Sequence, residues 1–173
     1  LGMLPNHRFK ILCKNNGLKW SVDVLHKLSE CSPAPLTLSD NLKFLLKEFK
    51  LRHYDEESII CVIDTLVKNA SVDLVLLFIR KVLQKNFESD DNESSDDDDD
   101  DHDDDHDDEV VLGLNFPGAA ENFSSLFLSV PWEEIKLEVE CLISLCHAEQ
   151  HQVWLNVAKL SGITDISHKV AET

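Results

Sequence analysis

The sequence lacks the short motifs by which common enzyme classes are recognised. Its five glycines form no phosphate-binding loop, it has no G-x-S-x-G segment, and spacing assigns no Cys–His or Ser–His–Asp arrangement. Acidic residues are so abundant that a chance pair of carboxylates carries no information about catalysis. The sequence therefore predicts a protein that is not an enzyme and that uses no cofactor.

Long apolar runs are missing as well. No apolar run approaches the length of a membrane span, and the start LGMLPNHRFK has no apolar core of a secretory signal. We interpret residues 1–3 as a cloning remnant or as the point of excision from a longer protein, of which this chain would be a fragment. We expect a nuclear protein, with the cytoplasm as the alternative.

The five cysteines form no C-x-x-C motif and are odd in number. Most of them stand in apolar, periodic segments, which is typical of reduced cysteines that pack as small hydrophobic side chains. The segment CLISLCHAEQH also concentrates two cysteines and two histidines. His147 and His151 are spaced as one helical turn, but Cys141 and Cys146 are five apart and diverge, so we expect no metal site.

Negative charge is concentrated in one segment. The chain has 173 residues and a formal net charge of −17, and residues 88–109 hold sixteen of its thirty-three acids and no Lys or Arg. Thirteen bases and nine acids precede this segment, whereas three bases and eight acids follow it. A segment with so much like charge and nothing apolar to bury is expected to be disordered.

Helical periodicity covers most of the remaining chain. Asn6, Ser21, Ser39, Asp55 and Ser71 are placed as N-caps, since short polar side chains accept hydrogen bonds from the free N–H groups of a first turn. Gly17 and Gly162 stand where a left-handed residue ends a helix. We expect helices near residues 6–17, 21–30, 39–51, 55–69, 71–85, 131–146 and 150–162, with a further short helix within 113–134.

These segments predict an all-α fold, either an irregular helical bundle or an array of helical hairpins, with about six to eight helices interrupted by a disordered acidic loop. We divide the chain into an N-terminal helical part (1–87), an acidic insert (88–109) and a C-terminal helical part (110–173). The two helical parts are expected to pack together as one domain, because apolar faces on both sides of the insert need mutual cover. No family signature is recognisable.

The acidic insert has several interpretations. It can raise solubility, or it can attract a basic partner such as a histone-like or Lys/Arg-rich segment, with fast, salt-sensitive association. It can also lie against bases of the same chain, with Lys43, Lys47, Lys50, Arg80 and Lys81 as candidates. Direct binding of nucleic acid to the insert is disfavoured, because phosphates would be repelled. The aspartates of this candidate site are Asp96, Asp97, Asp98, Asp99, Asp100, Asp101, Asp103, Asp104 and Asp105.

Two short patterns border the aspartate run. Ser94 and Ser95 have aspartates three residues downstream and resemble the acidophilic substrates of casein kinase 2, which implies candidate phosphorylation sites. The apolar segment after the acids resembles a SUMO-interacting motif, which implies addition of a strand to a sheet edge of SUMO. Burial of the same segment in the second helical part is the alternative. Its residues are Val110, Val111, Leu112 and Leu114.

We therefore expect a non-enzymatic protein–protein interaction domain, a scaffold or adaptor, whose acidic insert tunes binding. One alternative is a chaperone-like acidic binder of histones or other basic proteins. The other alternative is SUMO binding through the segment after the acids.

Overall fold

The computed structural model describes residues 5–49, 54–85 and 116–173. These residues form eight α-helices and one short 3-10 helix, with no strand among them, which confirms the predicted all-α fold. The predicted boundaries of the acidic insert lie outside the described residues. The helices are α1 (Asn6–Ser29), α2 (Leu38–Glu48), α3 (Glu56–Asn69), α4 (Val72–Lys85), α5 (Ala119–Leu128), α6 (Trp132–Ser144), η2 (Ala148–Gln150), α7 (His151–Ser161) and α8 (Thr164–Glu172).

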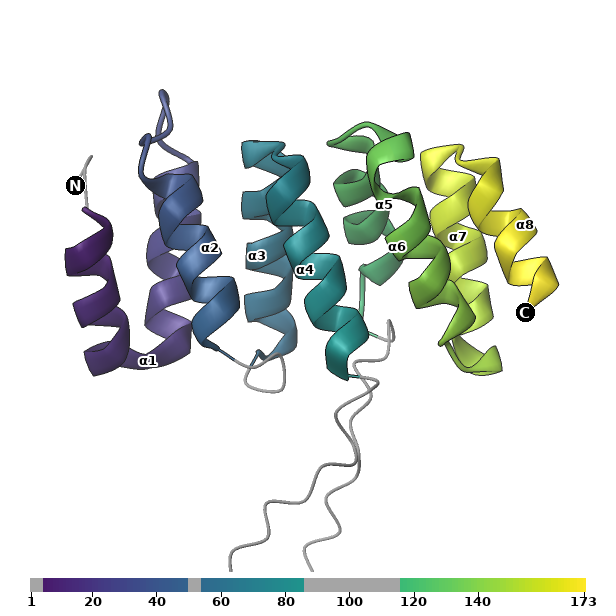
Figure 1. The fold of residues 1–173 in the computed structure, drawn as a ribbon, viewed down its shortest axis with the longest axis horizontal. Coiled ribbons are helices and arrows are strands. Elements are labelled where there is room, and N and C mark those ends of the chain that lie inside the picture. The colour runs from purple at the N-terminus through teal and green to yellow at the C-terminus, as the bar shows by residue number, and fades with distance from the viewer. Residues whose placement is uncertain (1–4, 50–53, 86–115) are drawn as a thin grey trace, which may run out of the picture.

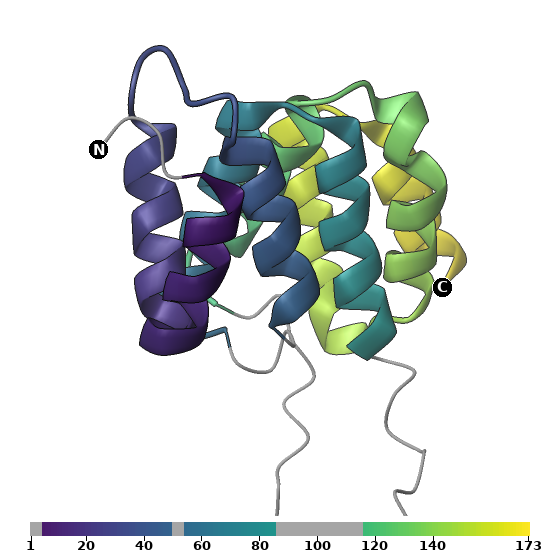
Figure 2. The same cartoon turned by 60° about the vertical axis from the view of Figure 1, so that its left-hand side comes forward.

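The helices form a two-layered array of hairpins (Figure 1). One layer contains α2, α4, α6 and α8, and the other contains the second half of α1 followed by α3, α5 and α7 (Figure 2). Within each layer a helix packs against the next helix of the same layer, as α4 does against α2 and α6. In the described part of the chain, no helix is both long and apolar enough to cross a membrane.

The helix α1 reverses direction at Gly17, where φ is 77° and ψ is −175°. Such a backbone is open almost only to glycine, which confirms the predicted break. The first half of α1 consequently lies beside α2, with the Phe9 and Phe44 rings 6.3 Å apart and edge-on. Lys10 Nζ lies 5.2 Å from the centre of the Phe44 ring.

Three of the predicted N-caps are wrong. Pro5 precedes α1, and Asn6 instead donates a hydrogen bond from Nδ2 to Asn41 Oδ1 at 3.0 Å. Ser21 is fully buried inside α1 and donates to the carbonyl of Gly17 at 2.6 Å, while Ser39 accepts a hydrogen bond from Asn69. Short polar side chains inside a helix bond to its own carbonyls or to a neighbour, so their sequence positions alone do not mark helix starts.

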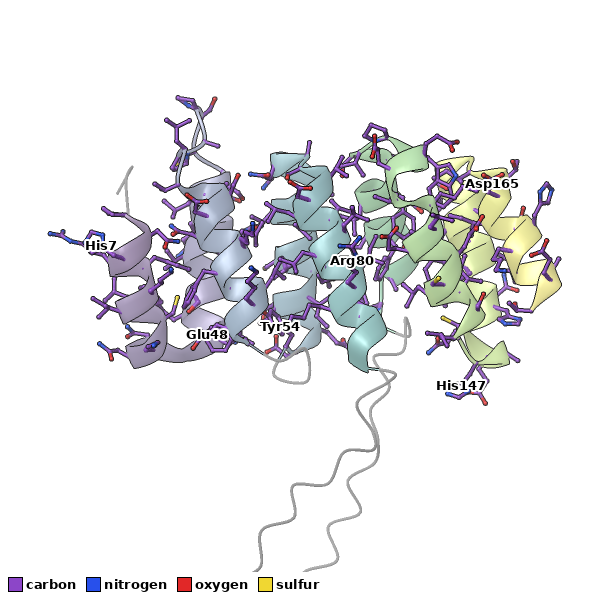
Figure 3. The ribbon with its side chains drawn as sticks, in the orientation of Figure 1. His7, Glu48, Tyr54, Arg80, His147 and Asp165 are labelled. Carbon is purple, nitrogen blue, oxygen red and sulfur yellow. The ribbon has the colours of Figure 1, made fainter. Side chains whose placement is uncertain are left out.

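Two other helix boundaries follow the sequence. Asp55 accepts a hydrogen bond from the Ser58 amide at 2.8 Å and caps α3. Gly162 ends α7 with a left-handed backbone. The last helix, α8, was not predicted from the sequence. It is short and fixed mainly by packing, with Asp165 accepting from Trp132 Nε1 at 3.0 Å and pairing with Lys136 at 2.8 Å (Figure 3).

The core runs without interruption through both layers. Phe78 of α4 lies 6.5 Å from Phe123 of α5, and Phe123 lies 6.2 Å from Trp154 of α7. Phe127 stacks on Trp154 with an interplanar angle of 4°. Helices that precede residues 86–115 in the chain therefore share one aromatic cluster with helices that follow them.

Candidate interaction surfaces

The partner-binding residues predicted from the sequence lie outside the described part of the chain. They are the aspartates between positions 96 and 105 and the apolar residues between 110 and 114. Ser94 and Ser95, the candidate phosphorylation sites, lie outside it too. Binding through these residues therefore stays a prediction.

A groove with a volume of about 520 Å³ opens between α5 and α7. Phe116 and Ala119 at its base are buried and Val153 is half-buried, whereas polar atoms make up most of the accessible lining. Leu160 stands at the edge with 52% of its surface exposed. The residues that line the groove are Phe116, Gly118, Ala119, Ala120, Glu121, Val153, Asn156, Lys159 and Leu160.

Local structure explains why the groove stays open. Gly118 precedes α5 with φ at 79°, a conformation that favours glycine, and two alanines follow it, so no large side chain fills this end. Ser124 Oγ lies 2.6 Å from the carbonyl of Ala120 and 3.3 Å from the carbonyl of Val157, to both of which it can donate. This hydroxyl ties α5 to α7 beside the groove.

The polar residues of the groove lie at its rim. Glu121, Asn156 and Lys159 are exposed, and Glu121 and Lys159 come from the two different helices. No His or Cys side chain is among the lining residues. The groove can thus receive an apolar side chain beside Val153 and Leu160 and orient it through one carboxylate, one amide and one ammonium group.

A second surface lies on the opposite layer, where α2 and α4 are neighbours. This surface contains four of the five basic residues that were candidates for contact with the acidic insert. Lys43 and Lys47 are exposed and Lys81 is half-buried, whereas Lys50 lies outside the described residues. Arg80 forms a 2.7 Å ion pair with Glu138 of α6 and is therefore engaged within the fold.

The histidines and cysteines do not converge on a metal site. Among the residues that the structure describes, no group of three or more His, Cys, Asp or Glu side chains could hold an ion. His147 precedes η2 and His151 begins α7, so they do not share one regular helix as their spacing had indicated (Figure 3). Cys146 accepts a hydrogen bond from Trp154 Nε1 at 3.0 Å.

All five cysteines are free, but their burial was only partly predicted. Cys13 is buried, and Cys61 and Cys146 are half-buried, whereas Cys31 and Cys141 are exposed. Burial raises the pKa of the Cys146 thiol, and the hydrogen bond from Trp154 offsets this only in part. Cys146 is thus a neutral packing side chain at neutral pH.

Comparisons with known proteins were made at the level of families, curated sequences and solved structures. No family model, no curated protein and no solved structure matches this chain.

Proposed function

We propose that this protein is a non-enzymatic protein-interaction domain, a scaffold or adaptor, whose α5–α7 groove binds an apolar segment of a partner protein. The observation that carries the proposal is the groove itself, in which Val153 and the exposed Leu160 lie beside a carboxylate, an amide and an ammonium group. Helical-hairpin arrays bind partners through such extended surfaces between stacked helices.

The partner segment is expected to insert one or two apolar side chains beside Leu160 and Val153. A basic residue of the partner would then meet Glu121, and an acidic residue would meet Lys159. Rim charges of this kind set orientation and association rate more than affinity. The acidic insert tunes the association by repelling acidic partners and attracting basic ones.

Two alternatives involve the acidic segment itself. In the first, the aspartates are the main site and capture histones or other basic proteins. In the second, the apolar residues at 110–114 bind SUMO. For a protein with these functions and with free cysteines, we propose a nuclear location, with the cytoplasm as the alternative.

Substitution of Leu160 tests the groove. Leu160→Glu places a charge at the groove edge, and it should cost little stability because the native side chain is half exposed. Tagged full-length protein and this variant would be used to purify partners from nuclear extract at low salt and at about 0.5 M salt, where exposed charge pairs are screened. Groove-bound partners should persist at high salt and be lost with Leu160→Glu.

Leu137→Glu is the matched control, since Leu137 is 72% exposed on α6, in the other layer. It should retain every partner that depends on the groove.

A chain without residues 88–109 separates the alternative functions. Partners that survive Leu160→Glu but disappear at high salt or with the deletion would overturn the groove proposal in favour of binding led by the insert.

A further inference from the structure

Three lysines form a basic strip along the seam between α2 and α4. Lys43 and Lys47 are four residues apart, and therefore one turn apart, on the exposed side of α2. Lys81 belongs to the C-terminal half of α4. The two helices pack side by side in one layer of the array. We use the name basic strip for Lys43, Lys47 and Lys81.

The direction of Lys81 follows from that of its neighbour. The helix α4 lies between α2 and α6, and Arg80 points to α6, where it meets Glu138 (Figure 3). Successive residues of an α-helix are about 100° apart. Lys81 therefore lies further round α4 and, being half-buried, occupies the flank that packs toward α2.

The lysines of the strip form no ion pair with the other described residues. Ion pairs among them engage Lys19, Lys68, Arg80, Lys136 and Lys169, together with His26, but none engages Lys43, Lys47 or Lys81.

Asp40 lies about one helical turn before Lys43 on the exposed side of α2 and offsets part of the charge there. Asp40 and Asp73 lie in the first turns of the two helices, whereas Lys47 and Lys81 lie toward their C-terminal ends. Glu48 lies close enough to Cys13 of α1 to raise the pKa of that thiol, although burial raises it more. The strip therefore keeps a net positive charge that is carried mainly by Lys47 and Lys81.

We propose that the basic strip is the docking site of residues 88–109 of the same chain. These residues carry sixteen acids and no Lys or Arg, so their charge is complementary to the strip. They begin three positions after Lys85, where α4 ends, and a chain of this length, fully extended, reaches about 70 Å at 3.3 Å per residue. It can therefore reach any part of α4, which is about 21 Å long at 1.5 Å per residue.

Covalent attachment favours this occupant over a separate acidic protein. Attachment within one chain raises the effective concentration of a segment to about the millimolar range, so individually weak contacts between carboxylates and ammonium groups become populated together. The docking involves neither α5 nor α7. It therefore goes beyond the proposed partner binding and can be tested without any partner.

Zero-length crosslinking of the full chain tests the proposal. A carbodiimide joins a carboxylate to an amine only when the two are in contact, and mass spectrometry locates each bond. Lys27 and Lys159 are matched controls, because both are exposed and lie on the opposite layer. Each yield is divided by the reactivity of the same lysine toward a small acylating reagent, which corrects for burial.

We expect bonds from residues 88–109 to Lys43, Lys47 and Lys81 to exceed those to the controls at least several-fold. The excess should vanish at about 0.5 M salt, because exposed charges are screened there. A mixture of ¹⁵N-labelled and unlabelled chains should give bonds within one chain only. Equal yields at strip and control lysines, or bonds that join labelled to unlabelled chains, would overturn the proposal.

A charge-neutralising variant gives an independent readout. Lys43→Gln with Lys47→Gln changes only exposed side chains, so the fold is retained. Amide NMR shifts of residues 88–109 in the full chain should move toward their high-salt positions in this variant. They should stay unchanged when Lys27→Gln is combined with Lys159→Gln. Unchanged shifts in the strip variant would contradict the docking.

Discussion

Arg80 and Glu138 form a 2.7 Å ion pair between α4 and α6, although they are 58 positions apart in the sequence. Arg80 precedes residues 86–115 and Glu138 follows them, so the pair connects helices that a long segment separates. Phe78 of α4 and Phe123 of α5 make an apolar contact across the same segment. Long connections permit such packing because the entropy cost of closing a loop grows only slowly with its length.

The ion pair itself should contribute little to stability. Arg80 is 58% exposed, and exposed pairs contribute about 0.2–1 kcal/mol in double-mutant cycles. Arg80→Ala, Glu138→Ala and the double variant, unfolded in urea, should give a coupling energy in that range that decreases with added salt. A coupling energy above about 2 kcal/mol would mean that the pair is far less solvated than its exposure indicates.

The apolar contact should contribute much more to stability than the ion pair does. Phe123 is fully buried between Phe78, Phe127 and Trp154, so Phe123→Ala should lower the free energy of unfolding by about 3–5 kcal/mol. Leu128→Ala is the control on the same helix, since Leu128 is 60% exposed and should change stability by less than about 0.5 kcal/mol. Circular dichroism and tryptophan fluorescence should report one shared transition. Two separate transitions would mean that the helices on each side of residues 86–115 unfold independently.

The Asp55 carboxylate should stabilise the start of α3. Hydrogen bonds from Ser58 lower its pKa, and Glu56 and Glu57 follow it in the first turn. Asp55→Ala should lower the free energy of unfolding by about 1 kcal/mol. Asp55→Ser should keep most of the stability of the cap, because serine also caps helices. Thermal unfolding at neutral pH measures both. Equal losses of stability in the alanine and serine variants would mean that the side-chain cap has no role.

Asp64 should contribute to acid sensitivity. Burial raises the pKa of this carboxyl, but hydrogen bonds from Lys68 and His26 outweigh burial, so the pKa falls below its ordinary value of 3.8. A group whose pKa is lower in the folded state stabilises the fold above its unfolded pKa, and the contribution is lost as pH falls through the folded pKa. The stabilisation should therefore be complete above about pH 5 and decline below about pH 4.

Asp64→Asn tests this window, because it removes the titrating group but keeps the shape of the side chain. Both proteins would be unfolded in urea at pH 7, 5, 4 and 3, values chosen about the ordinary carboxyl pKa. The difference in stability between the two should shrink at the acid end. A difference that stays constant with pH would show that Asp64 titrates alike in the folded and unfolded states.

Gly17 should tolerate no side chain, although space is available. A Cβ there would have no heavy atom within 4 Å, so the penalty comes from φ of 77° with ψ of −175° alone. Gly17→Ala should therefore cost about 1–3 kcal/mol. Gly162→Asn is the contrasting variant, because φ of 72° with ψ of 10° lies in the left-handed region that Asn accepts more readily. Similar losses in the two variants would contradict the assignment of strain to Gly17.

The sequence by itself determined where most helices form and where several of them end. Apolar periodicity and local hydrogen bonding act within a few residues, so Gly17, Asp55 and Gly162 could be assigned without tertiary contacts. Local patterns were insufficient where a residue had another partner. Ser21 has the composition of a cap, yet it is buried and bonds to the carbonyl of Gly17.

Only the tertiary structure decided which apolar faces cover one another. Periodicity shows that a face is apolar, but not which helix packs on it, and Leu160 therefore proved to be exposed at a groove edge. Phe116 and Val153, 37 positions apart, line that groove together because α5 and α7 are stacked in one layer. The basic strip arises in the same way, since Lys47 and Lys81 belong to two neighbouring helices whose adjacency is set by long-range burial of side chains such as Leu46 and Ile79.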